Sequence, residues 1–194
     1  MSIIHRTTLT PTKPELLAEW LPKQPWYRGT GTPEPVKAGG FRLDDPAGEV
    51  GLEFMAVTDT SGPEPVTYHV PMAYRGAPLA DAPDDALIGT TEHGVLGMRW
   101  VYDGAKDPVL VRELTALLKG EVPAHAQSVD GALDPTVHAR LALDDVPGEV
   151  RPEIVRVLEA GAKAPGDAVG EVSAEWSAAD ERRVRGVFVV VRGG

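Results

Sequence analysis

The sequence predicts an α+β fold in which an antiparallel sheet carries helices on one face and a second, smaller α+β unit follows. Three observations support this prediction. Segments of alternating apolar and polar residues, separated by turns rich in aspartate, proline and glycine, are typical of antiparallel strands. Two stretches with apolar residues three or four positions apart are typical of amphipathic helices. The chain has 194 residues, of which 42% are hydrophobic, and this suffices for one large core or two small ones.

The first expected helix spans residues 14–21. A short apolar run over residues 3–5 precedes it and favours a strand. Thr12 is a suitable N-cap, and Glu15 follows three residues later, so that each side chain can bond the other residue's backbone amide. Pro22 prevents the helix from continuing, because proline lacks the amide that a helix interior needs.

A meander of strands and a second helix are expected next. Turn residues at 44–48 and 59–63 mark where the first hairpins bend. The second helix begins after Asp107 and ends at Gly120. The expected strands span residues 36–43, 51–58, 66–74, 87–88 and 95–102.

The last third of the chain is expected to form the second unit. We expect residues 1–120 to be one domain and residues 121–194 a small α+β domain. Its expected elements are two strands paired with each other (126–133 and 136–143), a helix (152–160) and a second strand pair (169–176 and 184–192).

Composition excludes several classes of function. The chain has no cysteine and no asparagine, so neither a thiolate metal site nor an asparagine ligand for magnesium can form. The net charge is -10, which disfavours nucleic acid as a partner. No apolar run reaches the length of a membrane-spanning helix or a secretory signal. We therefore expect a soluble, cytoplasmic protein that binds neither nucleic acid nor a membrane.

Three motifs carry a resemblance to a known family. They are the stretches Tyr68 to Leu79, Leu87 to Gly97 and Arg99 to Gly104, and their order and spacing resemble the maltokinase N-terminal cap domain. The resemblance implies a cystatin-like α+β fold. In that family the cap precedes a kinase of the aminoglycoside-phosphotransferase type that phosphorylates maltose, and the catalytic residues lie downstream of the cap.

The resemblance implies a function without catalysis. No catalytic residue of the family has a counterpart here, and no glycine-rich phosphate loop precedes the last strand; residues 121–194 are compatible with a remnant of the kinase's intermediate lobe. We expect an accessory or regulatory protein whose partner is an enzyme of trehalose, maltose or α-glucan metabolism. We expect no catalytic residues, no cofactor and no metal ion.

An alternative interpretation is a small carbohydrate-binding module. Aromatic planes can stack on sugar rings, and neighbouring charged groups can bond hydroxyls. The competing explanation, which the sequence favours, is that these aromatic residues close the core of the sheet. The candidate residues are Tyr68, Tyr74, Arg75, Arg99, Trp100, Tyr102 and Asp103.

A third interpretation is an uncharacterised hydrolase or transferase. It requires Glu92, His93 and Asp103 to converge in a pocket. Among the serines, Ser61, Ser128 and Ser173 lack the flanking glycines of a nucleophile elbow. The basic run of Arg182, Arg183 and Arg185 is weak evidence for an anion site, whereas such a run is ordinary at a solvated hairpin end.

Overall fold

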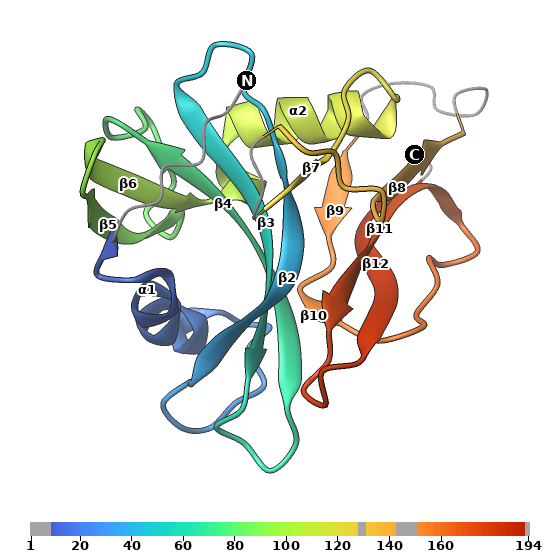
Figure 1. Cartoon of the computed structure of the whole chain (residues 1–194), viewed down its shortest axis with the longest axis horizontal. Helices are drawn as coiled ribbons and strands as arrows, with labels where there is room; N and C mark the ends of the chain where they lie inside the picture. Colours follow the sequence, from blue (N-terminus) through green and yellow to red (C-terminus); the bar gives the residue numbers. More distant parts are fainter. Residues whose placement is uncertain (1–8, 128–130, 143–150, 193–194) are drawn as a thin grey trace.

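The computed structural model describes residues 9–127, 131–142 and 151–192 (Figure 1). The expected strand over residues 3–5 lies outside these ranges. The first helix, α1, spans Lys13–Trp20 and has the predicted cap: the Thr12 hydroxyl accepts from the Glu15 amide, and the Glu15 carboxylate accepts from the Thr12 amide. A short 3-10 helix, η1 (Leu21–Lys23), continues from it. The predicted first helix is confirmed.

The second helix, α2 (Pro108–Leu118), is also confirmed. It follows a 3-10 turn, η2 (Gly104–Lys106). The Asp107 carboxylate caps α2 by accepting from the amides of Val109 and Leu110. Among the described residues, neither helix is long and apolar enough to cross a membrane.

The strands of the first part match the predicted meander closely. Their neighbours in the sheet follow the order β1-β5-β6-β4-β3-β2, and every pairing is antiparallel. These strands are β1 (Leu9–Thr10), β2 (Pro35–Leu43), β3 (Val50–Asp59), β4 (Val66–Arg75), β5 (Leu87–His93) and β6 (Gly97–Asp103).

The two helices cover opposite faces of this sheet, so the expectation of helices on one face is wrong. In β3, Phe54 packs in the cluster that contains Leu110 of α2, whereas its neighbour Met55 packs in the cluster that contains Leu17 of α1. Consecutive strand residues point to opposite faces. The central strand is buried on both sides, since its residues 52–59 are all buried, and each of its faces therefore needs its own cover.

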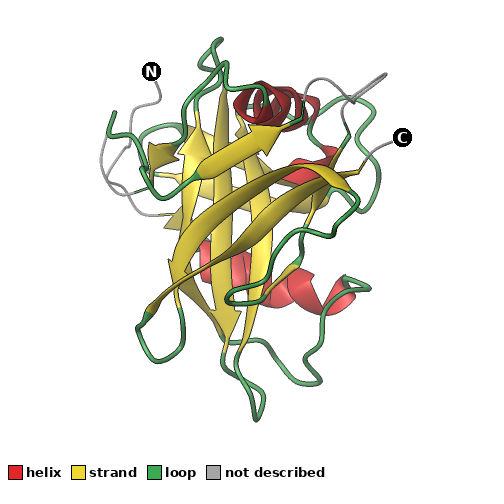
Figure 2. Cartoon of the chain, turned by 90° about the vertical axis from the view of Figure 1, so that its right-hand side faces the viewer, coloured by secondary structure: helices red, strands yellow, loops and turns green. Residues whose placement is uncertain are grey.

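The later strands extend the same sheet. Strand β11 (Ala168–Ser177) pairs with β12 (Arg183–Arg192), as predicted. It also meets β2 where Trp176 lies opposite Gly39. Figure 2, in which this side faces the viewer, shows two long strands crossing obliquely in front of the others.

The helix predicted over residues 152–160 is wrong. The segment forms two short strands, β9 (Pro152–Ile154) and β10 (Val157–Leu158). Strand β9 pairs with β12, and β10 pairs with β4, so the sheet closes on itself through this segment. Two strand edges are available to it, and its backbone groups pair with both of them.

The predicted pairing of residues 126–133 with 136–143 is also wrong. Strand β7 (His125–Ala126) pairs with β2, and β8 (His138–Leu141) pairs with β11. The backbone amide of Ala126 instead donates to the Ala132 carbonyl, and that of Asp134 donates to the Ala124 carbonyl. Each of these two short strands therefore pairs with a different long strand and not with the other short strand.

One hydrophobic core joins the two parts of the chain. Phe41 stacks on Phe54 with ring centroids 4.6 Å apart, and Phe188 of β12 lies 6.0 Å from Phe41. Leu114 of α2 and Trp176 of β11 belong to the same cluster. The described residues thus form a largely antiparallel sheet with two helices. The domain boundary near residue 120 and the cystatin-like assignment stay predictions.

Candidate functional site

Strands β4 and β6 carry the seven residues that the sequence put forward for sugar binding. Arg75 lies at the end of β4 and forms a bidentate pair with Asp107: Nε lies 2.6 Å from Oδ2, and Nη2 lies 3.0 Å from Oδ1. Asp107 is fully buried. The hydrogen bond with Asp107 raises the pKa of Arg75. This arginine ties the sheet to the first turn of α2.

Asp103, at the end of β6, has a similar structural role. Its side chain accepts from the amide of Ala105, in η2, and from Nη2 of Arg156 at 2.6 Å. The guanidinium of Arg156 also lies 5.0 Å from the centre of the Trp26 ring. The carboxylate is therefore bonded inside the fold.

The two tyrosines of β4 are interior groups. Tyr68 is fully buried, and its hydroxyl accepts from the backbone amide of Arg28 at 3.0 Å. Tyr74 donates to Glu53 at 2.8 Å. Burial, reinforced by the Glu53 charge, raises the pKa of Tyr74 well above its usual value. Neighbouring side chains of the core surround the Tyr68 ring, and the Lys13 ammonium lies 5.3 Å from the centre of the Tyr74 ring.

Glu53 is the centre of a buried polar cluster that includes Tyr74. Lys13 of α1 lies 2.6 Å from Oε2, and the Gln127 amide donates to Oε1 at 3.0 Å. Burial alone would raise the pKa of Glu53, but Lys13 and the hydrogen bonds outweigh it and hold the pKa below its ordinary value. The charged Glu53 carboxylate on β3 thus binds side chains of α1 and β4 and links the three elements.

The remaining candidates on β6 point in different directions. Tyr102 is 4% exposed, and its hydroxyl accepts from the Leu79 amide. Arg99 donates to the Leu96 carbonyl at 2.8 Å. Trp100 is half-buried. Arg99 lies on the opposite side of β6 from Trp100 and Tyr102, because residues one apart in a strand face opposite ways. The structure therefore does not bring the seven residues together, and sugar binding stays a prediction.

The residues proposed for hydrolysis also lie apart. Glu92 pairs with Met98 and His93 with Gly97 near one end of the β5–β6 hairpin, whereas Asp103 lies beyond its other end, next to Tyr102. The His93 ring accepts from the amides of Val95 and Leu96, which shapes the turn. In the part of the chain that the structure describes, no three metal-binding side chains cluster.

His69 is buried in the shared core. Its Nδ1 lies 3.1 Å from the Phe188 carbonyl oxygen, which makes Nδ1 the protonated nitrogen of the neutral ring. Burial, with the nearby Arg156 charge, lowers the pKa of His69 to about 3. This histidine is therefore neutral at physiological pH and has no access to a substrate.

The basic run at the β11–β12 hairpin is neutralised by neighbouring carboxylates. Arg182 bonds Asp180 at 2.6 Å, and Arg185 bonds Glu175 at 3.1 Å. Arg183 also lies 3.7 Å from Glu175. The explanation as an ordinary hairpin end fits this geometry.

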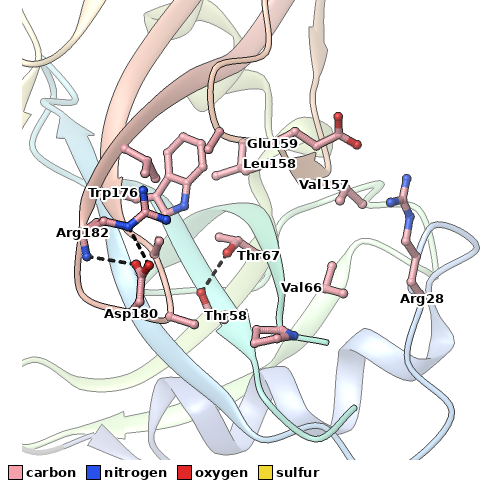
Figure 3. A pocket seen from close by; sticks show the side chains of 15 residues that line it. Arg28, Thr58, Val66, Thr67, Val157, Leu158, Glu159, Trp176, Asp180 and Arg182 are labelled. Carbon is pink, nitrogen blue, oxygen red and sulfur yellow. Dashed lines mark hydrogen bonds and ion pairs between the residues drawn. The ribbon is translucent and has the colours of Figure 1, made fainter. Parts of the chain in front are cut away.

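Sequence reasoning missed a pocket between the β3–β4 hairpin, β10 and the β11–β12 hairpin (Figure 3). Its volume is about 420 Å³. One local run in the sequence reaches it: of Trp26-Tyr27-Arg28, Arg28 lines the pocket. The lining side chains include Arg28, Thr58, Thr67, Val157, Trp176 and Val184.

An apolar hairpin tip is the second feature that the sequence did not predict. Val95 is 61% exposed, and Leu96 and Met98 are each 45% exposed. All three lie within four residues at the turn between β5 and β6. We call these three residues the apolar tip. Clustered exposed apolar side chains are typical of contact surfaces, whereas single ones are common everywhere.

The apolar tip and the strands β4 and β6 lie in one segment that matches a known family. The family model described as the maltokinase N-terminal cap domain matches residues 20–107. A comparison with curated proteins found no match. The matched segment begins at the last residue of α1 and ends at the Asp107 cap of α2. Over residues 20–107 this chain is therefore similar to the maltokinase N-terminal cap domain.

Proposed function

We propose that this protein is a non-catalytic, cytoplasmic accessory or regulatory protein of maltose, trehalose or α-glucan metabolism. It acts by contact with an enzyme of the maltokinase type. The match of residues 20–107 to the cap domain supports the choice of partner, because the name of that family joins the cap to a maltokinase.

The observation that carries the proposal is the different placement of charged and apolar side chains in the matched segment. Several of its buried charged side chains are paired inside the fold: Arg75 bonds Asp107, and Glu53 bonds Lys13 of α1, which precedes the segment. The segment also exposes a group of large apolar side chains, namely the apolar tip. When a partner buries an apolar surface of this kind, the free energy of binding becomes more favourable by roughly 25 cal/mol for each Å².

The proposal assigns the apolar tip to the centre of the contact. It projects at the end of a hairpin and can enter a groove on a partner. Apolar side chains at the centre of an interface dominate its energy, and the polar rim mainly sets specificity.

Calorimetric titration of the purified chain against a maltokinase-type enzyme tests this proposal. We expect saturable binding by the unchanged chain. The double variant Val95→Ser, Leu96→Ser should weaken it by at least about tenfold, since loss of central apolar contacts typically costs about 1.4 kcal/mol or more.

Two other exposed apolar residues provide matched controls. Val36 is 58% and Leu133 is 61% exposed, and both lie outside the apolar tip. The double variant Val36→Ser, Leu133→Ser should bind as the unchanged chain does. Equal loss in both double variants would contradict the assignment to the tip, and absence of binding by the unchanged chain would contradict the proposed partner.

The non-catalytic part of the proposal has its own test. The purified chain, incubated with ATP and maltose, should form no maltose phosphate above the level without protein. ATP-dependent phosphorylation that co-purifies with the chain, and disappears when the chain is removed by its own antibody, would overturn this part.

A further inference from the structure

The chain has four tryptophans, and Trp100 is the one that lies outside the core. Trp20 and Trp26 pack in the cluster that contains residues of α1, and Trp176 belongs to the cluster that contains residues of α2. Among the described residues, neither cluster includes Trp100, although its side chain is half-buried. An indole has one of the largest apolar surfaces of any side chain. That surface is therefore not used in either core.

Trp100 lies on the face of β6 that α1 does not cover. Its neighbour Val101 packs in the cluster with α1, and consecutive residues of a strand point to opposite faces. Helix α2 covers the other face of the sheet, but it packs against β8, β9 and β11. Figure 1 shows α2 extending to the right, whereas β5 and β6 lie at the left of the sheet. The two helices therefore leave this face of β6 without a helix packed along it.

Trp100 continues the apolar tip along this face. Met98, which belongs to the tip and is 45% exposed, lies two residues from Trp100 and so points to the same side of β6. On the neighbouring strand β5, the exposed Thr90 lies opposite Trp100, and Leu87, which is 41% exposed, lies opposite Tyr102. A group of exposed apolar residues is typical of a protein contact, and tryptophan is one of the residues that most often dominate the energy of such a contact.

One carboxylate borders this surface. Glu92 lies opposite Met98 in the β5–β6 ladder, and its side chain is exposed. Within the described ranges, no lysine or arginine forms an ion pair with Glu92. The chain as a whole has a net charge of -10, which favours approach by a basic surface. A lysine or arginine beside an apolar groove on the partner would match both Glu92 and the neighbouring apolar side chains.

We propose that Trp100 anchors the partner protein by entering an apolar groove, and that Glu92 meets a basic side chain at the edge of that groove. The inference rests on the proposed function, because it takes the partner to be the enzyme that the apolar tip contacts. It adds the chemistry of the partner's surface, namely an apolar groove bordered by lysine or arginine. Buried aromatic anchors hold an interface together, and charges at its rim set orientation and association rate.

Fluorine NMR of the chain labelled with 5-fluorotryptophan tests the anchor. It follows all four tryptophans at once, and replacing one tryptophan at a time assigns the signals. Addition of a maltokinase-type enzyme should move the Trp100 signal in a saturable way. The signals of Trp20 and Trp176 should keep their positions, because both rings are buried inside the fold. An unmoved Trp100 signal, in a mixture where calorimetry detects binding, would overturn the inference.

Substitutions separate the anchor from the fold. Trp100→Ala should weaken binding by about thirtyfold and leave the melting temperature close to that of the unchanged chain, because the ring lies outside both clusters. Glu92→Lys should weaken binding by about tenfold. Glu64→Lys makes the same change of charge at an exposed position in the turn between β3 and β4 and should leave binding unchanged.

The failure of this inference is distinguishable from the failure of the proposed function. Absence of binding by the unchanged chain would contradict the proposed function and, with it, this inference. Binding that the tip variant Val95→Ser, Leu96→Ser weakens, but that Trp100→Ala leaves intact, would overturn the anchor alone. Equal effects of Glu92→Lys and Glu64→Lys would overturn the basic partner group at Glu92.

Discussion

Arg156 Nη2 lies 2.6 Å from Asp103 Oδ2. The contact joins the bend between β9 and β10 to the end of β6, and both side chains are largely withdrawn from water, with 16% and 3% exposed. It links the family-matched segment to the last third of the chain. Together with the pairing of β10 with β4, it makes residues 151–192 part of the support for the cap-like segment.

The first prediction concerns this ion pair. Arg156→Met should lower the free energy of unfolding by about 3 kcal/mol, because the buried Asp103 carboxylate loses its partner. Urea denaturation measures the change. Arg182→Met, which breaks the exposed pair with Asp180, should have little effect. Equal effects of the two substitutions would contradict the structural importance of Arg156.

The second prediction compares the two helix caps. Asp107→Ala removes two cap hydrogen bonds and the bidentate partner of Arg75, so it should lower the free energy of unfolding by about 3 kcal/mol or more. Thr12→Ala removes an exposed cap of α1 and should lower it by about 1 kcal/mol. Thermal denaturation followed by circular dichroism ranks the two variants, and the reverse order would refute the prediction.

The third prediction concerns the pH dependence of stability. His69 has a folded pKa of about 3, whereas the unfolded chain takes up its proton below about pH 6.5. The unfolded state therefore binds more protons between these values, and stability falls as the pH falls through this window. The slope from His69 approaches about 1.4 kcal/mol for each pH unit.

His69→Gln is the matched variant for this slope. Between pH 6 and 5 most carboxylates stay charged, so the difference between the two proteins isolates the histidine. The variant should be less stable at pH 7 but should lose less stability on acidification. Parallel stability curves for the two proteins would show that His69 is not neutral and buried.

The fourth prediction concerns Gly40 in β2. Its φ is +119°, and a Cβ there would lie in severe overlap with the Phe54 carbonyl oxygen of the paired strand. Gly40→Ala should therefore disrupt the β2–β3 ladder and lower the free energy of unfolding by about 3 kcal/mol. Gly48→Ala, with a φ of +70° and open space around it, should lower stability by about 1 kcal/mol. Denaturant titration distinguishes the two.

Local signals in the sequence predicted the elements that depend on neighbouring residues. The cap formed by Thr12 and Glu15, the Asp107 cap and the β3–β4 hairpin all follow from residues close together in the chain. The segment 152–160 was mispredicted because its structure depends on edges supplied by β4 and β12. Those strands lie far away in the sequence, and no pattern within residues 152–160 predicts pairing with them.

The candidate site was harder to predict for the same reason. Tyr68 and Asp103 were recognised as unusual residues, but their partners, Arg28 and Arg156, lie 40 and 53 positions away. A charged or aromatic residue has the same appearance in a sequence whether it binds a ligand or another part of the fold. The apolar tip is local, yet its exposure depends on how β1 and α1 cover the rest of β5.

Hydrogen exchange of the chain, alone and with a maltokinase-type enzyme, tests the central claim most directly. The account predicts slower exchange of the backbone amides from His93 to Met98 in the mixture, with little change at the pocket between the β3–β4 and β11–β12 hairpins. Unchanged exchange over the apolar tip, in a mixture where other amides become protected, would contradict the account.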